Sequence, residues 1–125
     1  MNDLERFPDP RSMTHTDEAG ETRLRGWRCE ECSMALALES PWCPRCLGTL
    51  REVQFGPFGT VWSSTVVRIP LPGRTPPYGL LYVDLDDGPR VLGHLATLVP
   101  TQVAIGEKVR LVANTELGDL AFEIV

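Results

Sequence analysis

The sequence lacks a long apolar run. None of its apolar stretches approaches the roughly 20 residues that a membrane-spanning helix needs. The start of the chain, from Met1 to Pro8, also lacks a basic segment followed by an apolar one, which is the pattern of a secretory leader. These two absences argue against a membrane span and against export. We therefore expect a soluble, cytoplasmic protein with no membrane partner.

An excess of positive charge is also missing. The chain contains 12 Lys and Arg residues against 17 Asp and Glu residues, which gives a net charge of −5. Residues 29–125 are acidic by themselves, so the balance does not depend on the N-terminal segment. General nucleic-acid binders gain affinity by neutralising many phosphates with Lys and Arg. We therefore do not expect a nucleic-acid partner.

Motifs of catalytic sites are absent as well. The sequence has no serine-hydrolase elbow, no phosphate-binding glycine loop and no dinucleotide fingerprint. His94 ends a predicted strand, and no motif places a nucleophile or carboxylate around it, so we interpret it as a packed or surface residue rather than a general acid or base. Asp84, Asp86 and Asp87 flank a predicted turn, where Asp is favoured for turn chemistry rather than as a catalytic pair. We expect no catalytic residue in this chain.

The second half of the chain lacks the 3.6-residue apolar period of helices and shows strand-like alternation instead. Asp86–Pro89 is a strong hairpin turn, and the proline-rich segment 70–77 cannot continue a ladder. Segment 95–103 is the one place where a short helix or an irregular crossover fits. We predict strands at Glu52–Phe55, Gly59–Ile69, Tyr78–Leu85, Arg90–Leu95, Lys108–Asn114 and Leu120–Ile124.

Five or six short antiparallel strands most simply close into a small barrel, because closure removes exposed edges. An OB-type barrel fits best. In the strand at Gly59–Ile69, strict alternation places Val61, Ser63, Thr65 and Val67 on one face and Trp62 on the other.

The four cysteines form two C-x-x-C pairs, Cys29–Cys32 and Cys43–Cys46, with ten residues between the pairs. Each pair can form a tight knuckle, and two knuckles supply the tetrahedral four-sulfur shell that zinc accepts. Pro44 and Gly48 suit the sharp turn of the second knuckle. We predict a structural zinc ion held by Cys29, Cys32, Cys43 and Cys46. A rubredoxin-like iron site, disulfides and free thiols are the alternatives.

A zinc ion in this position is expected to stabilise the fold rather than to react. A ribbon of about 25 residues has almost no core, so metal binding supplies its folding free energy. Four protein ligands fill every position around the metal, whereas a catalytic zinc keeps one position open. No fifth cysteine exists to act as a nucleophile.

These observations predict a mainly β protein with three segments. Residues 1–22 are polar and form a flexible N-terminal tail, residues 23–50 form a rubredoxin-like zinc ribbon, and residues 51–125 form the OB-fold barrel. If the tail docks on a partner, its plausible anchors are Leu4, Phe7 and Met13. Packing is the default interpretation of the three tryptophans and partner contact the alternative; they are Trp27, Trp42 and Trp62.

With ribbon and barrel side by side, the chain resembles the family named domain of unknown function thirty-five (DUF35), from about Leu24 to the C-terminus. The resemblance rests on five segments in order: the two cysteine knuckles, Gly59–Val67, Pro77–Gly88 and Ile105–Leu111.

The resemblance implies a partner. Members of the family accompany thiolase-superfamily enzymes, including thiolases, hydroxymethylglutaryl-CoA synthase assemblies, acetyltransferases with a thiolase-like subunit, and side-chain retro-aldolases of steroid degradation. The small protein is then a scaffold in a hetero-oligomer that helps to form or enclose the acyl-CoA site at the shared interface, and the catalytic residues lie on the enzyme. The arginines that could meet CoA phosphates are Arg45, Arg51, Arg68, Arg74, Arg90 and Arg110.

Two other functions stay open at this point. OB-folds and ribbons commonly bind single-stranded nucleic acid, although the acidic barrel argues against it. An independent enzyme or electron carrier is the second alternative. The expected function is a non-catalytic accessory subunit of an acyl-CoA enzyme.

Overall fold

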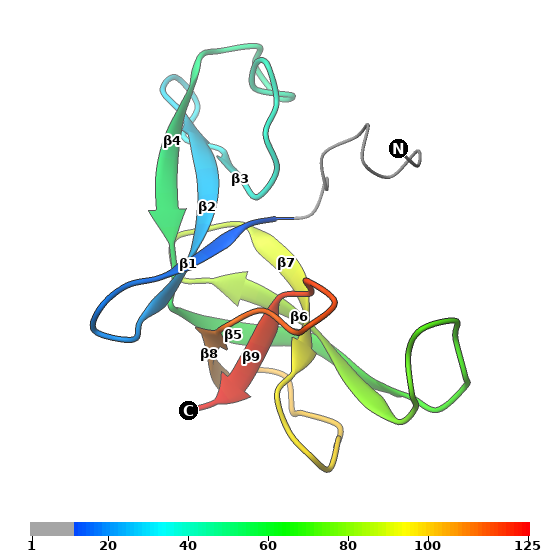
Figure 1. Ribbon diagram of the computed structural model, residues 1–125. Helices are drawn as coiled ribbons and strands as arrows, with labels where there is room; N and C mark the ends of the chain where they lie inside the picture. Colours follow the sequence, from blue (N-terminus) through cyan, green and yellow to red (C-terminus); the bar gives the residue numbers. More distant parts are fainter. Residues whose placement is uncertain (1–11) are drawn as a thin grey trace, which may run out of the picture.

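The computed structural model describes residues 12–125, which form strands and loops with no helix (Figure 1). No span for crossing a membrane as a helix is found in this part of the chain. The nine strands are β1 (Thr14–Thr16), β2 (Thr22–Cys29), β3 (Ala35–Leu36), β4 (Leu50–Phe55), β5 (Phe58–Val67), β6 (Tyr78–Leu85), β7 (Arg90–Leu95), β8 (Lys108–Val112) and β9 (Ala121–Ile124).

Five of these strands close into a barrel in the order β5-β6-β7-β9-β8. Strand β8 returns to pair with β5, and β7 and β9 form the one parallel pair of the barrel. This is the strand order of a five-stranded Greek-key OB barrel. Together with the cysteine cluster above it, the barrel confirms the predicted fold class.

The barrel core follows from strand alternation. In β6, Leu81, Val83 and Leu85 point inward and are buried, whereas Tyr82 between them points outward. Phe122 of β9 is completely buried and lies where Gly93 of β7 leaves room, since a Cβ at Gly93 would lie 2.6 Å from the Phe122 ring. Burial of each such side chain stabilises the fold by about 1.5–3 kcal/mol.

A β-bulge in β5 corrects one prediction. Val61 pairs with Val83 and Ser63 pairs with Tyr82, so Trp62 is the extra residue. Beyond the bulge the inward and outward faces are exchanged, and Thr65 is exposed rather than on the face of Val61. The strand predicted to reach Ile69 ends two residues earlier in the structure, at Val67.

The first four strands form a second sheet in which β2 pairs with β1, β3 and β4. Strand β4 therefore belongs to the cysteine-bearing sheet, although it lies within the segment predicted as barrel. Residues 1–11 of the predicted tail, with Leu4 and Phe7, lie outside the described residues. The remainder of that tail contains β1, which pairs with β2. The three-segment division itself stays a prediction.

Phe55 joins the two sheets. A Cβ at Gly26 of β2 would lie 2.6 Å from its ring, and a Cβ at Gly88 in the β6–β7 turn would lie 2.9 Å from it. The Arg28 guanidinium lies over the same ring at 5.4 Å and donates a hydrogen bond to the Asp87 carbonyl. In Figure 1 β2 and β4 rise from the barrel at this joint, and the loops that carry the cysteines lie at the far end.

The segment between β7 and β8 is an irregular crossover, the second of the two predicted alternatives. Ser64 fixes it to the barrel, because its hydroxyl donates to the Val103 carbonyl at 2.7 Å and accepts from the Val103 N–H at 2.9 Å.

Candidate metal centre

Two turns position the cysteines. Strand β2 ends at Cys29, whose carbonyl accepts a hydrogen bond from the Ser33 N–H at 3.1 Å. In the second turn the Leu47 N–H donates to the Cys43 carbonyl at 2.8 Å. Ser33 and Leu47 both have positive φ, near 64° and 65°. Each C-x-x-C pair is thus a knuckle whose chain reverses directly after it.

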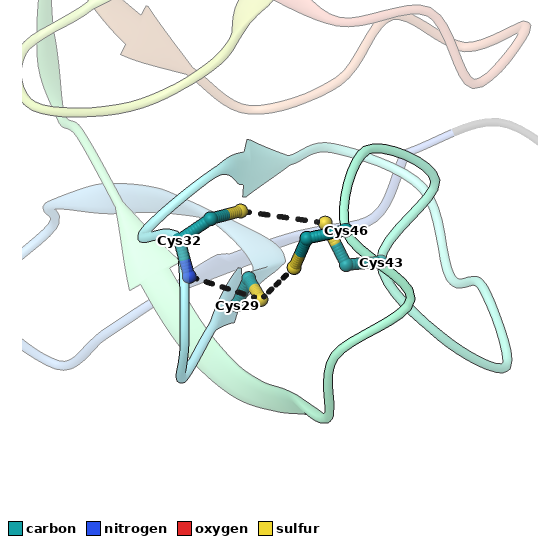
Figure 2. Close-up of side chains that lie close together, drawn as sticks. All are labelled: Cys29, Cys32, Cys43 and Cys46. Carbon is teal, nitrogen blue, oxygen red and sulfur yellow. Dashed lines mark hydrogen bonds between the residues drawn. The ribbon is translucent and has the colours of Figure 1, made fainter.

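The four sulfurs converge on one point. All four Sγ atoms lie within 4.8 Å of one another, and Figure 2 shows the side chains pointing toward a common centre. The Sγ atoms of Cys29 and Cys46 are 3.4 Å apart and those of Cys32 and Cys43 are 3.6 Å apart. A disulfide needs about 2.05 Å, and zinc–sulfur bonds of about 2.3 Å place tetrahedral ligands about 3.8 Å apart. The cluster has the dimensions for one metal ion.

The backbone around the sulfurs favours thiolates. The N–H groups of Glu31 and Cys32 donate to the Cys29 Sγ at 3.4 and 3.5 Å. A Cβ at Gly48 would lie 3.0 Å from the Cys29 Sγ and 3.2 Å from the Cys46 Sγ, so the absence of a side chain there allows the second loop to close over the cluster. Cys29 and Cys43 are buried, whereas Cys46 is exposed.

The surroundings shift the pKa values of the cysteine thiols in opposite directions. The backbone N–H of Met34, followed by the Arg45 side chain, lowers the pKa of Cys32 to about 6. For Cys46 the Gly48 N–H lowers the pKa, but hydrogen bonding with the sulfurs of Cys29 and Cys32 outweighs it and raises the pKa to about 12. A divalent cation would remove this conflict by compensating four neighbouring negative charges.

His94, around which no sequence motif placed a partner, lies in a second cluster of polar side chains. Its Nε2 is 3.5 Å from the Asp119 carboxylate, and its ring stacks on Tyr78 with centroids 5.3 Å apart. Arg74 donates two hydrogen bonds to Asp119, at 2.6 and 2.7 Å. Thr115 donates a third to the same carboxylate at 3.0 Å.

This cluster joins two loops beside a cavity of about 300 Å³. The hydrogen bonds from Arg74 and Thr115 lower the pKa of Asp119 to about 2, and burial lowers the pKa of His94. Asp119 is therefore an anion bound to Arg74 rather than a group ready to accept a proton. Sequence reasoning missed the cluster because Arg74 and Asp119 lie in loops 45 positions apart, and no local motif relates them.

The acidic residues at the β6–β7 turn do not form a paired-acid site. Asp84 binds Arg90 at 2.7 Å, Asp86 lies 3.7 Å from Lys108, and Asp87 lies 3.5 Å from Arg28. Three carboxylates thus have three different cations, which supports the interpretation as turn residues.

The tryptophans and arginines are spread over the molecule. Trp42 and Trp62 are 54% and 48% exposed, so packing accounts for only part of each ring, whereas Trp27 is less exposed and packs under Arg25. Arg74, Arg90 and Arg110 each bind a carboxylate of this chain, and Arg45 donates to the Cys32 carbonyl. These four candidate phosphate-binding arginines thus each interact with a different group of this chain.

Comparison with known proteins identifies the family. Residues 52–114, half of the chain, match the family model described as ChsH2, C-terminal OB-fold domain. A DUF35 domain-containing scaffold protein of Pyrococcus furiosus is 37% identical over 95 residues, which are 74% of this chain and 69% of that protein. The chain belongs to the DUF35 family.

Three further relatives of this DUF35 chain are informative. A DUF35 domain-containing scaffold protein of Methanothermobacter thermautotrophicus is 29% identical over 71% of this chain and 70% of its own length. The 3-oxo-4,17-pregnadiene-20-carboxyl-CoA hydratase alpha subunit of Mycobacterium tuberculosis is 47% identical over 42% of this chain and 17% of its own. A solved Ltp2-ChsH2(DUF35) aldolase aligns with a TM-score of 0.63 and 28% identity, covering 82% of this chain and 84% of that one.

Proposed function

We propose that this DUF35 protein is a non-catalytic accessory subunit of an acyl-CoA enzyme. Its partner is a thiolase-superfamily enzyme, on which it docks as a scaffold and helps to form or enclose the acyl-CoA site. Support comes from its relatives, two of which are named scaffold proteins, a third an acyl-CoA hydratase subunit, and a fourth an aldolase complex.

One observation on the chain itself carries the proposal. The reactive groups that the described residues bring together already have partners within the chain. The four sulfurs face one another, and the Asp119 carboxylate beside His94 is bound by Arg74. Groups that are paired in this way stabilise the fold, and an accessory subunit that supplies no catalytic residue needs only a stable fold.

We further propose that Cys29, Cys32, Cys43 and Cys46 hold a structural zinc ion. Their spacing fits zinc–sulfur distances, and four thiolates leave no position for water or substrate. Bound zinc would supply folding free energy to the ribbon. Four thiolates bound to one metal ion, rather than paired in disulfides, fit a reducing compartment such as the cytoplasm.

Co-expression tests the accessory function. The tagged chain is produced together with the thiolase-superfamily enzymes of the same genome, beginning with the one encoded nearest to it. We expect one enzyme to elute with the chain in a fixed ratio and to lose acyl-CoA turnover when the chain is omitted. Separate elution together with independent activity would refute the proposal.

Single-stranded nucleic-acid binding is the rival function, favoured by the OB barrel and by the exposed aromatic rings of Trp62 and Tyr82. It predicts binding to oligonucleotides that weakens steeply with salt. The net charge of −5 opposes it.

A further inference from the structure

An apolar surface crosses three neighbouring barrel strands. Trp62 of β5, Tyr82 of β6 and Leu92 of β7 are 48%, 44% and 47% exposed. The rings of Trp62 and Tyr82 meet edge to face with centroids 6.0 Å apart, and Tyr82 lies directly opposite Leu92 in the β6–β7 pair. Trp62 is the extra residue of the β5 bulge, and its side chain is exposed on this surface. Figure 1 shows the three strands side by side.

The surface continues from the barrel to the cysteine-bearing sheet. Leu80 and Leu92 of the barrel and Ala37 and Leu38, just after β3, line one hollow of about 460 Å³. The polar residues Ser12, Arg90, His94 and Asp119 also line it. Leu38 is 53% exposed. We define the apolar strip as Trp62, Tyr82, Leu92 and Leu38. It extends across both sheets, so a single partner surface can contact both.

Arg90, the cation that lies beside the strip, is already compensated. The Arg90 guanidinium lies 4.0 Å from the centre of the Trp62 ring and donates to both oxygens of Asp84, at 2.7 and 3.1 Å. Its charge therefore faces a carboxylate of the same chain. The strip thus offers aromatic and aliphatic area without net positive charge.

We propose that the apolar strip is the surface on which the acyl-CoA enzyme docks, through an apolar, uncharged area of that enzyme that places a side chain in the hollow. The proposal rests on the accessory function proposed above. The charges beside the strip favour a protein partner over a nucleic acid. A nucleic acid needs uncompensated cations for its phosphates, whereas an uncharged protein surface does not. The strip and its neighbour also contain Trp, Tyr and Arg, the residue types that contribute most of the binding energy in protein–protein interfaces.

Substitutions in the strip test the proposal on the full zinc-loaded chain. Leu92→Glu and Trp62→Ser are each expected to weaken the dissociation constant for the co-purified enzyme at least about tenfold. Leu38→Glu gives a variant outside the barrel ladder and is expected to weaken binding similarly. The matched control is Leu98→Glu, which places the same charge on a fully exposed leucine outside the strip and should change the constant less than about twofold.

The outcomes separate the two proposals. If the unaltered chain binds no thiolase-superfamily enzyme, the accessory function fails. If it binds and the three strip variants, with unchanged zinc content and melting temperature, bind equally well, the docking surface alone is wrong. Oligonucleotide binding that the Trp62→Ser variant loses would assign the strip to nucleic acid and also overturn the proposal.

Discussion

Gly48 shows how one residue without a side chain permits four cysteine sulfurs to lie close together. Its position beside the sulfurs of Cys29 and Cys46 leaves no room for a methyl group unless the sulfurs move. A sulfur held by zinc is less free to move than a free thiol, because its distance to the metal is fixed near 2.3 Å.

We therefore expect Gly48→Ala to weaken zinc binding about tenfold, the scale of changes directly behind metal ligands. Competition with a zinc chelator measures the affinity. The control is Gly79→Ala in β6 of the barrel, where a Cβ would lie equally close to a neighbour, 3.1 Å from the Leu95 Cβ, but not to a cysteine sulfur. Equal zinc affinity of the two variants would contradict the proposed role of Gly48.

Asp119 gives a second prediction at this scale. Its pKa in the folded protein is about 2, below the unfolded value of about 3.9, so its ion pair stabilises the fold above pH 4 and this stabilisation is lost as the pH falls from about 4 to 2. Asp119→Asn should lower the free energy of unfolding by about 2 kcal/mol at pH 7. Urea unfolding of both proteins between pH 7 and pH 3 should show this difference shrinking.

Asp84→Asn is the matched control for Asp119→Asn. The side chains of Asp84 and Arg90 are 46% and 45% exposed, against 13% and 28% for Asp119 and Arg74. Exposed pairs contribute less than about 1 kcal/mol. If the two Asn variants destabilise equally at pH 7, Asp119 does not have the role assigned to it.

At the scale of elements, β9 closes the barrel by pairing with β7 on one side and β8 on the other. Phe122 lies at this closure and is completely buried. Phe122→Ala should cost about 3–5 kcal/mol, because the cavity it leaves cannot collapse between paired strands. Phe58→Ala, at a ring that is 41% exposed, should cost less than about 1.5 kcal/mol. Thermal unfolding measures both, and similar losses would contradict this account of the core.

The elements also show what a sequence can predict. Strands β6 and β7 match their predicted bounds because alternation and a strong turn define them locally. Alternation identifies a strand but not its neighbour, so β4 was expected in the barrel and pairs with β2 instead. The bulge at Trp62 depends on pairing with β6. The Arg74–Asp119 pair depends on two loops that only the closed barrel brings together.

At the scale of the whole molecule, the proposed zinc ion and the hydrophobic core are expected to stabilise different parts. The hydrophobic core lies mainly in the barrel and reaches the other sheet at Leu24 and Phe55, whereas between residues 29 and 48 the only buried hydrophobic residues are Cys29 and Cys43. Removal of zinc with a chelator should expose the amides of residues 29–48 to hydrogen exchange and leave those of β6 protected. It should also weaken enzyme binding, because Leu38 of the apolar strip lies within this released segment. Simultaneous loss of protection in β6 would show that the two parts unfold as one.

The packing of Phe55 against Gly26 and Gly88 has a consequence for any assembly. Because the Phe55 ring is in close contact with Gly26 on one side and Gly88 on the other, the angle between the cysteine-bearing sheet and the barrel is fixed. If one protein binds the cysteine-bearing sheet and another binds the barrel, their relative orientation is therefore set by the packing of Phe55. A larger residue at Gly88, on the barrel side of this contact, would push against Phe55 and change the angle between the two parts, which would misalign the attached proteins without changing the atoms that contact them.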